Sequence, residues 1–236
     1  MSHSSGLFSV IARQNAIILP SYNVVQANAV NGEGASLSSI TATLPSTATS
    51  GNLIVAAASL RLRSATITFS GSGWTYIEQK DLSYPSASIA YKISDGTETS
   101  VTASHSASVQ RMSISVIEIE NVQTGSIDTT FTDNGISTTG SFSTGTISGQ
   151  TQFPQMALGI WAGDDDGTVD PGARSYTSGY TEIAAATTRP STSNRAHVIM
   201  AIGTVESGNG EVTLTTANSV VRGLSALVMA EDDNAV

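Results

Sequence analysis

The chain has 236 residues, of which only 12% are charged, and its formal net charge is −9 with a pI of about 4.6. Its 10 basic residues are scattered along the sequence. They therefore cannot neutralise a run of phosphates, which argues against direct binding to nucleic acid or to an anionic membrane surface. The sequence contains no cysteine, so no disulfide framework holds the fold.

The first 34 residues are predicted to form an extended N-terminal arm outside the main domain, ending in the turn at residues 31–34. No basic region precedes an apolar run, so we expect neither a signal peptide nor a membrane span. The arm is a candidate for main-chain pairing with a neighbouring protein, and an arm that folds over its own sandwich is the alternative. The predicted partner-binding residues are Leu7, Phe8, Val10, Ile11, Ile17, Ile18, Leu19 and Tyr22.

Residues 35–236 are predicted to form one domain in which a single pattern occurs twice, at about residues 36–121 and 142–232. Each copy has an apolar strand, a Gly-aromatic-Thr triplet (73–75 and 179–181), an apolar strand, a Gly turn, a Thr-rich strand and a last apolar strand. Such a repeat implies one supersecondary unit used twice. Low charge and frequent Thr and Val favour strands. We therefore expect an all-β, jelly-roll-like sandwich built from two sequence-similar halves, which pair Ile93 with Ile202, Arg111 with Arg222, and Ile117 with Val228.

Three local features are predicted within the first copy. Gly71-Ser72-Gly73 is read as the loop of a hairpin between strands 65–70 and 74–79, and Asp95-Gly96 as a tight turn. The apolar phase changes along residues 112–120, which predicts a β-bulge near Val116–Ile117. Glu118 and Glu120 are read as solubility residues on an exposed sheet face. Residues 122–150, which join the copies, are expected to hold sparse edge strands.

Several strands of the second copy are apolar at both alternating positions, at residues 156–162, 196–205 and 223–230. Strands covered on both faces usually lie under helices, and no helical pattern is present. The second face is therefore filled by small residues under loops, or it meets another subunit. We expect a homo-oligomer, with a trimer favoured.

Four carboxylates between residues 163 and 170 form a cluster that could supply oxygen ligands to Ca²⁺. The spacing does not match a known calcium loop, and a solvated loop is the favoured interpretation. His3, His105 and His197 are too far apart in sequence for a zinc motif. No cofactor is expected. The calcium candidates are Asp164, Asp165, Asp166 and Asp170.

No nucleophile elbow, phosphate loop or pair of carboxylates flanking a cleft is visible, so the chain is predicted not to be an enzyme. A carbohydrate-binding module is an alternative, since amphipathic aromatic side chains can stack on sugars. Of the candidates, Trp161 is read as core, and Trp74 and Tyr180 as packing residues. Only Tyr84 and Tyr176 are read as carried by loops, and Tyr176 would act with the 164–170 loop.

Four segments carry a likeness to known proteins: residues 45–60 (PSTATSGNLIVAAASL), 73–75 (GWT), 87–94 and 115–122 (SVIEIENV). They resemble a family of bacteriophage virion β-sandwich proteins that serve as tail, fibre or capsid-accessory proteins. The resemblance implies a structural protein located in the virion. A capsid decoration protein of the cement or head-fibre type, attached through its arm to proteins such as the major capsid protein, is the first expectation. A tail or collar component is the second.

Overall fold

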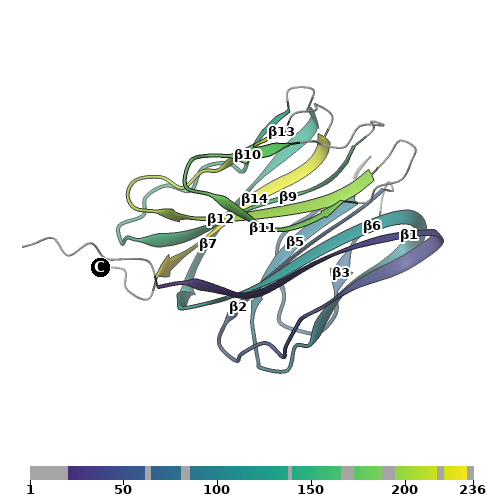
Figure 1. Cartoon of the computed structure of the whole chain (residues 1–236), viewed down its shortest axis with the longest axis horizontal. Coiled ribbons are helices and arrows are strands. Elements are labelled where there is room, and N and C mark those ends of the chain that lie inside the picture. The colour runs from purple at the N-terminus through teal and green to yellow at the C-terminus, as the bar shows by residue number, and fades with distance from the viewer. Residues whose placement is uncertain are drawn as a thin grey trace, which may run out of the picture.

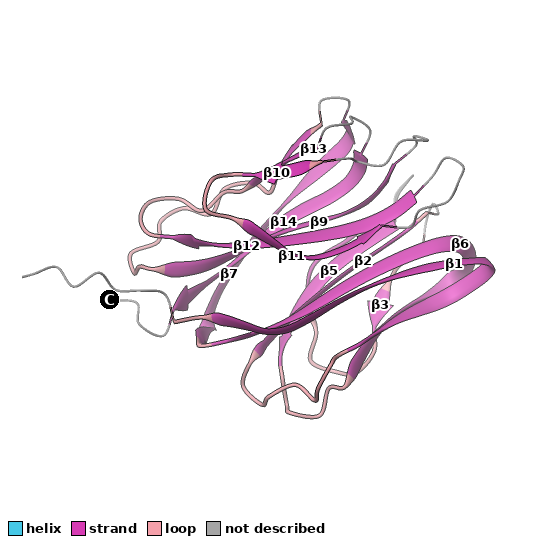
Figure 2. Cartoon of the chain, viewed as in Figure 1, coloured by secondary structure: helices cyan, strands magenta, loops and turns pink. Residues whose placement is uncertain are grey.

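The computed structural model describes residues 21–61, 65–80, 86–137, 140–165, 173–187, 195–216 and 221–232. Strands are the regular secondary structure of this part of the chain, and none of its segments is a helix that could cross a membrane (Figure 2). The predicted all-β class is confirmed. The strands are β1 (Asn23–Thr43), β2 (Leu53–Leu60), β3 (Thr68–Phe69), β4 (Thr75–Lys80), β5 (Ser86–Ile93), β6 (Ser100–Glu120), β7 (Val122–Ser137), β8 (Ser141–Ser143), β9 (Gln155–Asp165), β10 (Arg174–Tyr176), β11 (Thr181–Thr187), β12 (Arg195–Val205), β13 (Thr213–Thr216) and β14 (Val221–Asp232).

Two antiparallel sheets, each made from one half of the chain, face each other (Figure 1). Sheet A has the order β1-β6-β2-β5-β4, with β3 also paired to β6, and sheet B has the order β7-β14-β9-β12-β11. When the five strands of each sheet are numbered by their order along the chain, both sheets have the order 1-5-2-4-3. The connectivity differs from that of a single jelly roll, because neither sheet takes strands from both halves.

The cross-strand register shows which residues of the two sheets are equivalent. Arg111 corresponds to Arg222 and Ile117 to Val228, but the residue equivalent to Ile202 is Tyr91 rather than Ile93, a difference of two positions from the sequence alignment. The matching pairs are Thr75–Tyr91 with Thr181–Ile202, Val55–Tyr91 with Leu158–Ile202, and Val55–Ile117 with Leu158–Val228.

The sandwich has four layers, because each half also covers its own outer face. In the first half, the C-terminal end of β1 (residues 39–43) pairs with the N-terminal end of β6 (residues 100–104), and β3 pairs with β6 beside them. Together these segments cover the outer face of sheet A. The separate sheet β10-β13-β8 does the same for sheet B. One apolar core fills the space between sheets A and B, and two further cores lie under the outer layers.

This layering explains the strands that are apolar at both alternating positions. In β9, Leu158 and Ile160 face sheet A, whereas Ala157 and Trp161 pack outward against residues of β8 and β13 such as Leu214. The second face is thus covered by the same chain. The physical reason for expecting a subunit interface on these strands is thereby removed, although the oligomeric state itself stays a prediction.

Two predictions are wrong: the end of the N-terminal arm and the hairpin at residues 71–73. The arm was expected to end at residue 34, but β1 begins at Asn23, and residues 23–33 pair with residues 111–120 of β6. The segment 71–73 is not a hairpin loop, because β3 pairs with β6 and β4 pairs with β5. The turn instead carries the chain from the outer layer into sheet A, with Gly71 and Gly73 at positive φ.

The predicted bulge near Val116–Ile117 is also wrong, since β6 pairs with β2 without a register shift from Met112 to Ile119. The apolar phase changes because both faces of β6 are buried: Val116 lies in the outer core and Ile117 in the central core. The expected edge strands in residues 122–150 are confirmed as β7 and β8.

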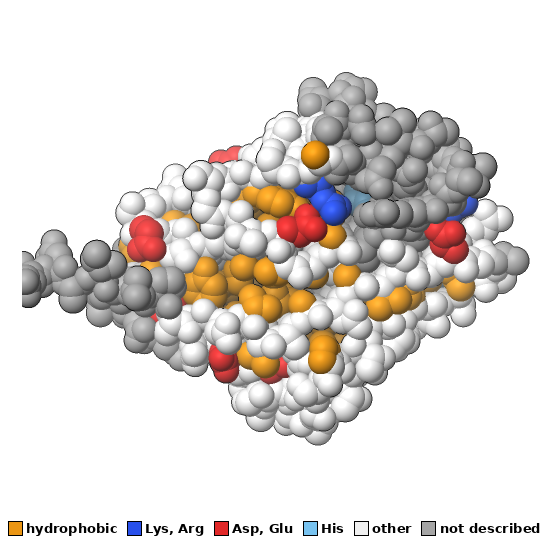
Figure 3. Space-filling view, in the orientation of Figure 1, with side chains coloured by type: hydrophobic (Ala, Val, Ile, Leu, Met, Phe, Trp, Pro, Cys, Tyr) orange, Lys and Arg blue, Asp and Glu red, His pale blue; other side chains and the backbone are white. Residues whose placement is uncertain are grey.

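Hydrophobic side chains form a band on one face of the molecule, between the edge strands β11 and β1 (Figure 3). There the central core reaches the surface through partly buried residues such as Val24 and Ile183.

Candidate functional site

Of the predicted partner-binding residues, the structure describes Tyr22, because the described part of the chain begins at Ser21. Leu7, Phe8, Val10, Ile11, Ile17, Ile18 and Leu19 lie outside the described residues. Tyr22 belongs to the folded body: it packs against the central core, and its hydroxyl is 2.7 Å from Oγ1 of Thr204. Burial raises the pKa of the Tyr22 hydroxyl, with smaller opposing and supporting effects from Thr204 and nearby carboxylates.

Just before β1, the chain is held by a cluster of hydrogen bonds that we call the Ser21 clamp. The backbone N–H groups of Ser21 and Tyr22 donate to Oδ2 of Asp232, at 2.5 and 2.9 Å, and the Ser21 hydroxyl donates to Oδ1 at 2.7 Å. Asn121 Nδ2 donates to the Ser21 carbonyl at 3.0 Å. Asp232 is fully buried at the end of β14, and Asn121 lies between β6 and β7. The clamp thus joins the start of β1 to the ends of both halves.

Of the four calcium candidates, Asp164 is the one whose side chain the structure describes. Asp164 is buried, with 3% of its surface exposed, and it lies in strand β9 rather than in a loop. Asp165 ends the same strand, and its side chain lies outside the described residues, as do Asp166 and Asp170. Within the described residues, no group of three or more His, Cys, Asp or Glu side chains could hold a metal ion.

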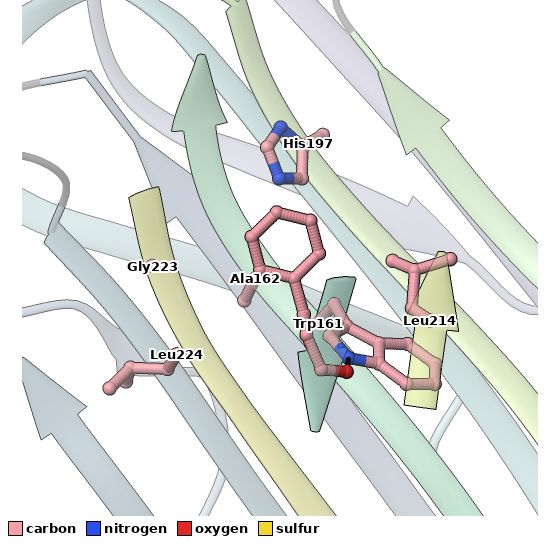
Figure 4. Close-up of a pocket in the computed structure, with 7 residues that line it drawn as sticks. Trp161, Ala162, His197, Leu214, Gly223 and Leu224 are labelled. Atoms are coloured by element: carbon pink, nitrogen blue, oxygen red, sulfur yellow. Dashed lines mark hydrogen bonds between the residues drawn. The ribbon is translucent and has the colours of Figure 1, made fainter. Parts of the chain in front are cut away.

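His197 in β12 borders a small cavity of about 10 Å³ (Figure 4). Its lining is mostly apolar and includes Trp161, whose indole N–H donates to the Phe142 carbonyl at 3.1 Å. His197 is 1% exposed, and its Nδ1 has no hydrogen-bond partner among the described residues. Burial, and to a lesser extent the charge of Arg174, lowers the pKa of His197 to about 4. The cavity has room for about one water molecule, so it is a packing feature rather than a ligand site.

A much larger hollow lies between the corner at residues 70–74 and the turn that joins β5 to β6. We call it the Trp74 groove. Its volume is about 330 Å³, and hydroxyl and charged side chains are frequent among its residues. It is lined by Ser70, Gly71, Ser72, Trp74, Lys92, Asp95, Thr97, Glu98, Thr99, Ser100 and Val101.

A buried ion pair forms part of the groove. Lys92 Nζ contacts Oε1 of Glu98, and the Lys92 and Glu98 side chains are only 7% and 10% exposed. Burial by itself would raise the pKa of Glu98, but hydrogen bonds from Lys92 and Ser94 outweigh it and hold the pKa at about 2. At the rim, Asp95 Oδ1 accepts hydrogen bonds from the Thr97 backbone N–H at 3.0 Å and from the Thr97 hydroxyl at 2.5 Å. The predicted Asp95-Gly96 turn is confirmed, and Gly96 has φ of 86°.

Trp74 is fixed in place at the edge of the groove. Its indole N–H donates to the Ser70 carbonyl at 2.8 Å, and its ring centroid is 5.3 Å from that of Phe69. The Lys92 ammonium lies 6.0 Å from the Trp74 ring centroid. The sequence interpretation assigned Trp74 to packing and residues 95–96 to a turn. It missed the groove because these residues meet only when β4, β5 and β6 are assembled.

Of the two aromatic residues that were expected to be carried by loops, Tyr176 is described, and it lies in a strand. Tyr176 lies in β10, its ring centroid is 5.7 Å from that of Trp161, and its hydroxyl donates to Glu182. Burial, followed by that hydrogen bond, raises the pKa of the Tyr176 hydroxyl. Tyr84 lies outside the described residues. Trp161 is 2% exposed, which confirms its predicted place in the core.

Glu118 has a role that the sequence did not reveal. It was read as a solubility residue, but it is fully buried. Its carboxylate accepts hydrogen bonds from Gln26 Nε2 at 2.5 Å, from the Thr49 backbone N–H at 2.8 Å and from Asn52 Nδ2 at 2.6 Å. Glu118 therefore anchors the segment between β1 and β2 to sheet A.

No family model matches this sequence, and the searches of curated proteins and of solved structures give no match either.

Proposed function

We propose that this chain is a non-enzymatic structural protein of a phage particle, attached to other virion proteins, such as the major capsid protein, through residues 7–19. A capsid decoration protein of the cement or head-fibre type is the favoured role. The observation that carries the proposal is the Ser21 clamp, because it holds residues 21 and 22, which closely follow the apolar sequence 7–19, to the ends of both halves.

The clamp suits an attachment segment for a mechanical reason. Two backbone N–H groups and one hydroxyl, all from residues 21–22, bond to the carboxylate of Asp232 in sheet B. Hydrogen bonds to a charged acceptor are stronger than neutral ones, at about 1.5–3 kcal/mol each. A force on the N-terminal segment would be shared by β14 and by β1, whose pairing with β6 runs through residues 23–33. The body would then resist peeling at its first strand.

In this proposal the particle carries the protein as a homo-oligomer, with a trimer favoured. Because the outer faces of both sheets are covered within the chain, copies would meet along edge strands instead. β7 is an edge strand of sheet B, and its Phe131 is 47% exposed. Light scattering on the purified protein would distinguish a trimer from a monomer of 24.2 kDa.

The proposal is tested by removing residues 1–20 and no more. A deletion to residue 30 would remove part of β1 and unfold sheet A, whereas a chain that starts at Ser21 keeps the clamp and every described strand. The gene is replaced in the phage, and gradient-purified particles are analysed by mass spectrometry. We expect the full chain in the particles, and we expect the shortened chain to fold but to be lost from them.

An Asp232→Ala variant with the full N-terminus serves as the second arm of the test. It opens the clamp without altering residues 7–19, so we expect attachment at reduced occupancy. Full occupancy by the shortened chain, or absence of the unmodified chain from particles, would exclude the proposal. Gold-labelled antibody on intact particles separates capsid placement from the alternative of a tail or collar component.

A further inference from the structure

We propose that the Trp74 groove binds a neutral sugar residue of a glycan. The groove is a different location from the predicted carbohydrate site, which used Tyr176 and residues 164–170. It does not involve residues 7–22, so the proposal is independent of how the protein attaches to a particle.

The size and chemistry of the groove fit a small polar ligand. Its volume of about 330 Å³ lies at the lower end of the range for small-molecule sites, about 300–1,000 Å³. Such sites are usually mostly apolar, but here Trp74 is the one aromatic ring in a lining rich in Ser and Thr hydroxyls. One aromatic side chain among many hydrogen-bonding groups matches a pyranose, which has C–H groups on its faces and hydroxyls around its edge.

The charges of the groove favour a neutral ligand. Lys92 and Glu98 neutralise each other, and Asp95 adds one negative charge at the rim. No unpaired cation is therefore left among the lining residues to attract a phosphate or a sialic acid, and the Lys92 ammonium repels a metal ion. The same pair can bind hydroxyl groups, because an ammonium has three N–H donors and a carboxylate has several lone pairs. Their burial holds donor and acceptor in fixed positions before a ligand arrives.

The second half fills the equivalent positions with different residues. Tyr180 occupies the position of Trp74, and Gly203 that of Lys92. A Cβ atom on Gly203 would lie 2.9 Å from ring carbons of Tyr180, so the ring packs directly on the strand. In the first half, the Lys92 side chain lies beside the corresponding ring instead. The side chain at this position therefore sets how closely the aromatic ring approaches the strand.

The test uses the two tryptophans as reporters. The protein has only Trp74 and Trp161, and Trp161 is buried in the core of the other half. The ¹H–¹⁵N spectrum therefore shows two indole signals, which a Trp74→Phe variant assigns. Glucose, galactose, mannose and N-acetylglucosamine are titrated separately to 100 mM, a concentration that suits a polar, open site with a dissociation constant of roughly 1–10 mM. We expect at least one sugar to shift the Trp74 signal saturably and to leave the Trp161 signal unchanged.

Three variants make the result specific. Trp74→Ala should weaken binding at least tenfold, measured from backbone amide shifts of residues 94–100. The double variant Lys92→Met with Glu98→Gln, which removes both charges together, should also weaken it. Tyr180→Ala, at the equivalent position of the second half, should bind like the unmodified protein. Inorganic phosphate and sialyllactose serve as anionic controls and should produce no saturable shift.

Three outcomes would overturn the proposal. The first is the absence of a saturable Trp74 shift with all four sugars. The second is equal binding by the Trp74→Ala variant. The third is a response to the anionic controls alone, which would make the groove an anion site. None of these outcomes bears on the attachment test, because a chain that starts at Ser21 retains the whole groove.

Discussion

Two equivalent rows of residues, one in each sheet, show that the same strand arrangement can carry different side chains. In sheet A, Lys92, Ile54 and Glu118 lie side by side on β5, β2 and β6. The equivalent row of sheet B is Gly203, Ala157 and Met229. Both rows are buried and face the outer layer of their half.

In the first half, this row is stabilised by an ion pair and hydrogen bonds. In the second half, the equivalent row is stabilised by close packing. Lys92 pairs with Glu98, and Glu118 accepts three hydrogen bonds. In sheet B, a Cβ on Gly203 would meet the Tyr180 ring at 2.9 Å. A shared strand order therefore does not fix the chemistry of a buried position. The Trp74 groove lies in the half whose row carries charged residues.

Among the variants that test this difference between the two halves, Lys92→Met should have the largest effect on stability. The variant keeps most of the side-chain stem but leaves the Glu98 carboxylate buried without its cation, so we expect a loss of about 3–5 kcal/mol in the free energy of unfolding. Urea denaturation measures it. Adding Glu98→Gln should restore most of the loss, and equal destabilisation of the single and double variants would contradict the argument. Lys80→Met is the control, because Asp133 in its ion pair is 50% exposed and the loss should be below about 1 kcal/mol.

Glu118→Met places the residue of the second half into the first. The Thr49 N–H and the amides of Gln26 and Asn52 would lose their acceptor, and each buried unsatisfied group costs about 1–3 kcal/mol. We expect a loss of about 3 kcal/mol and faster hydrogen exchange at residues 46–52. Glu120→Met, two residues along the same strand, should change stability by no more than about 0.5 kcal/mol. A similar loss in both variants would show that Glu118 has no special role.

Lowering the pH should destabilise the folded protein through protonation of His197 in the second half. In the unfolded chain this group gains a proton near pH 6.5, whereas the folded protein resists protonation until about pH 4. The unfolded state therefore binds more protons within this window. Stability is fully present above pH 6.5 and falls as the pH decreases towards 4, by at most about 3 kcal/mol.

The measurement is the free energy of unfolding between pH 7 and 4, for the unmodified protein and for His197→Ser. Ser86 is the equivalent residue of the first half, so the variant makes the two halves alike. The variant should be less stable at pH 7 because of the cavity it creates, but it should lack this part of the pH dependence. Parallel curves for the two proteins would contradict the assignment.

The smallest expected effect is that of Gly203→Ala. The added Cβ would crowd the Tyr180 ring and the Gly179 carbonyl, and overpacking of this kind costs about 1–3 kcal/mol. Thermal unfolding would show a lower Tm. Gly125→Ala is the matched control, because an added Cβ there meets no atom within 4 Å. If both variants behaved alike, the close packing of the second half would not be what separates it from the first.

The sequence by itself determined the all-β class, the Asp95-Gly96 turn and the burial of Trp161, because these follow from local propensity and apolar content. It also placed Arg111 and Ile117 correctly against Arg222 and Val228. The pairing of Ile93 with Ile202 was wrong by two residues, because alternation fixes which face a side chain takes but not the register along the strand.

Only the tertiary structure decided what covers each face of a strand. Hydrophobic strands look the same in sequence whether a neighbouring subunit or a layer of the same chain covers them, so the intramolecular cover of β9 could not be read from its residues. Glu118 and the Lys92–Glu98 pair were equally hidden, because the partners of a buried charge come from distant segments. The Trp74 groove exists for that same reason: its walls come from strands β5 and β6 and from two connecting segments, which meet only in the folded protein.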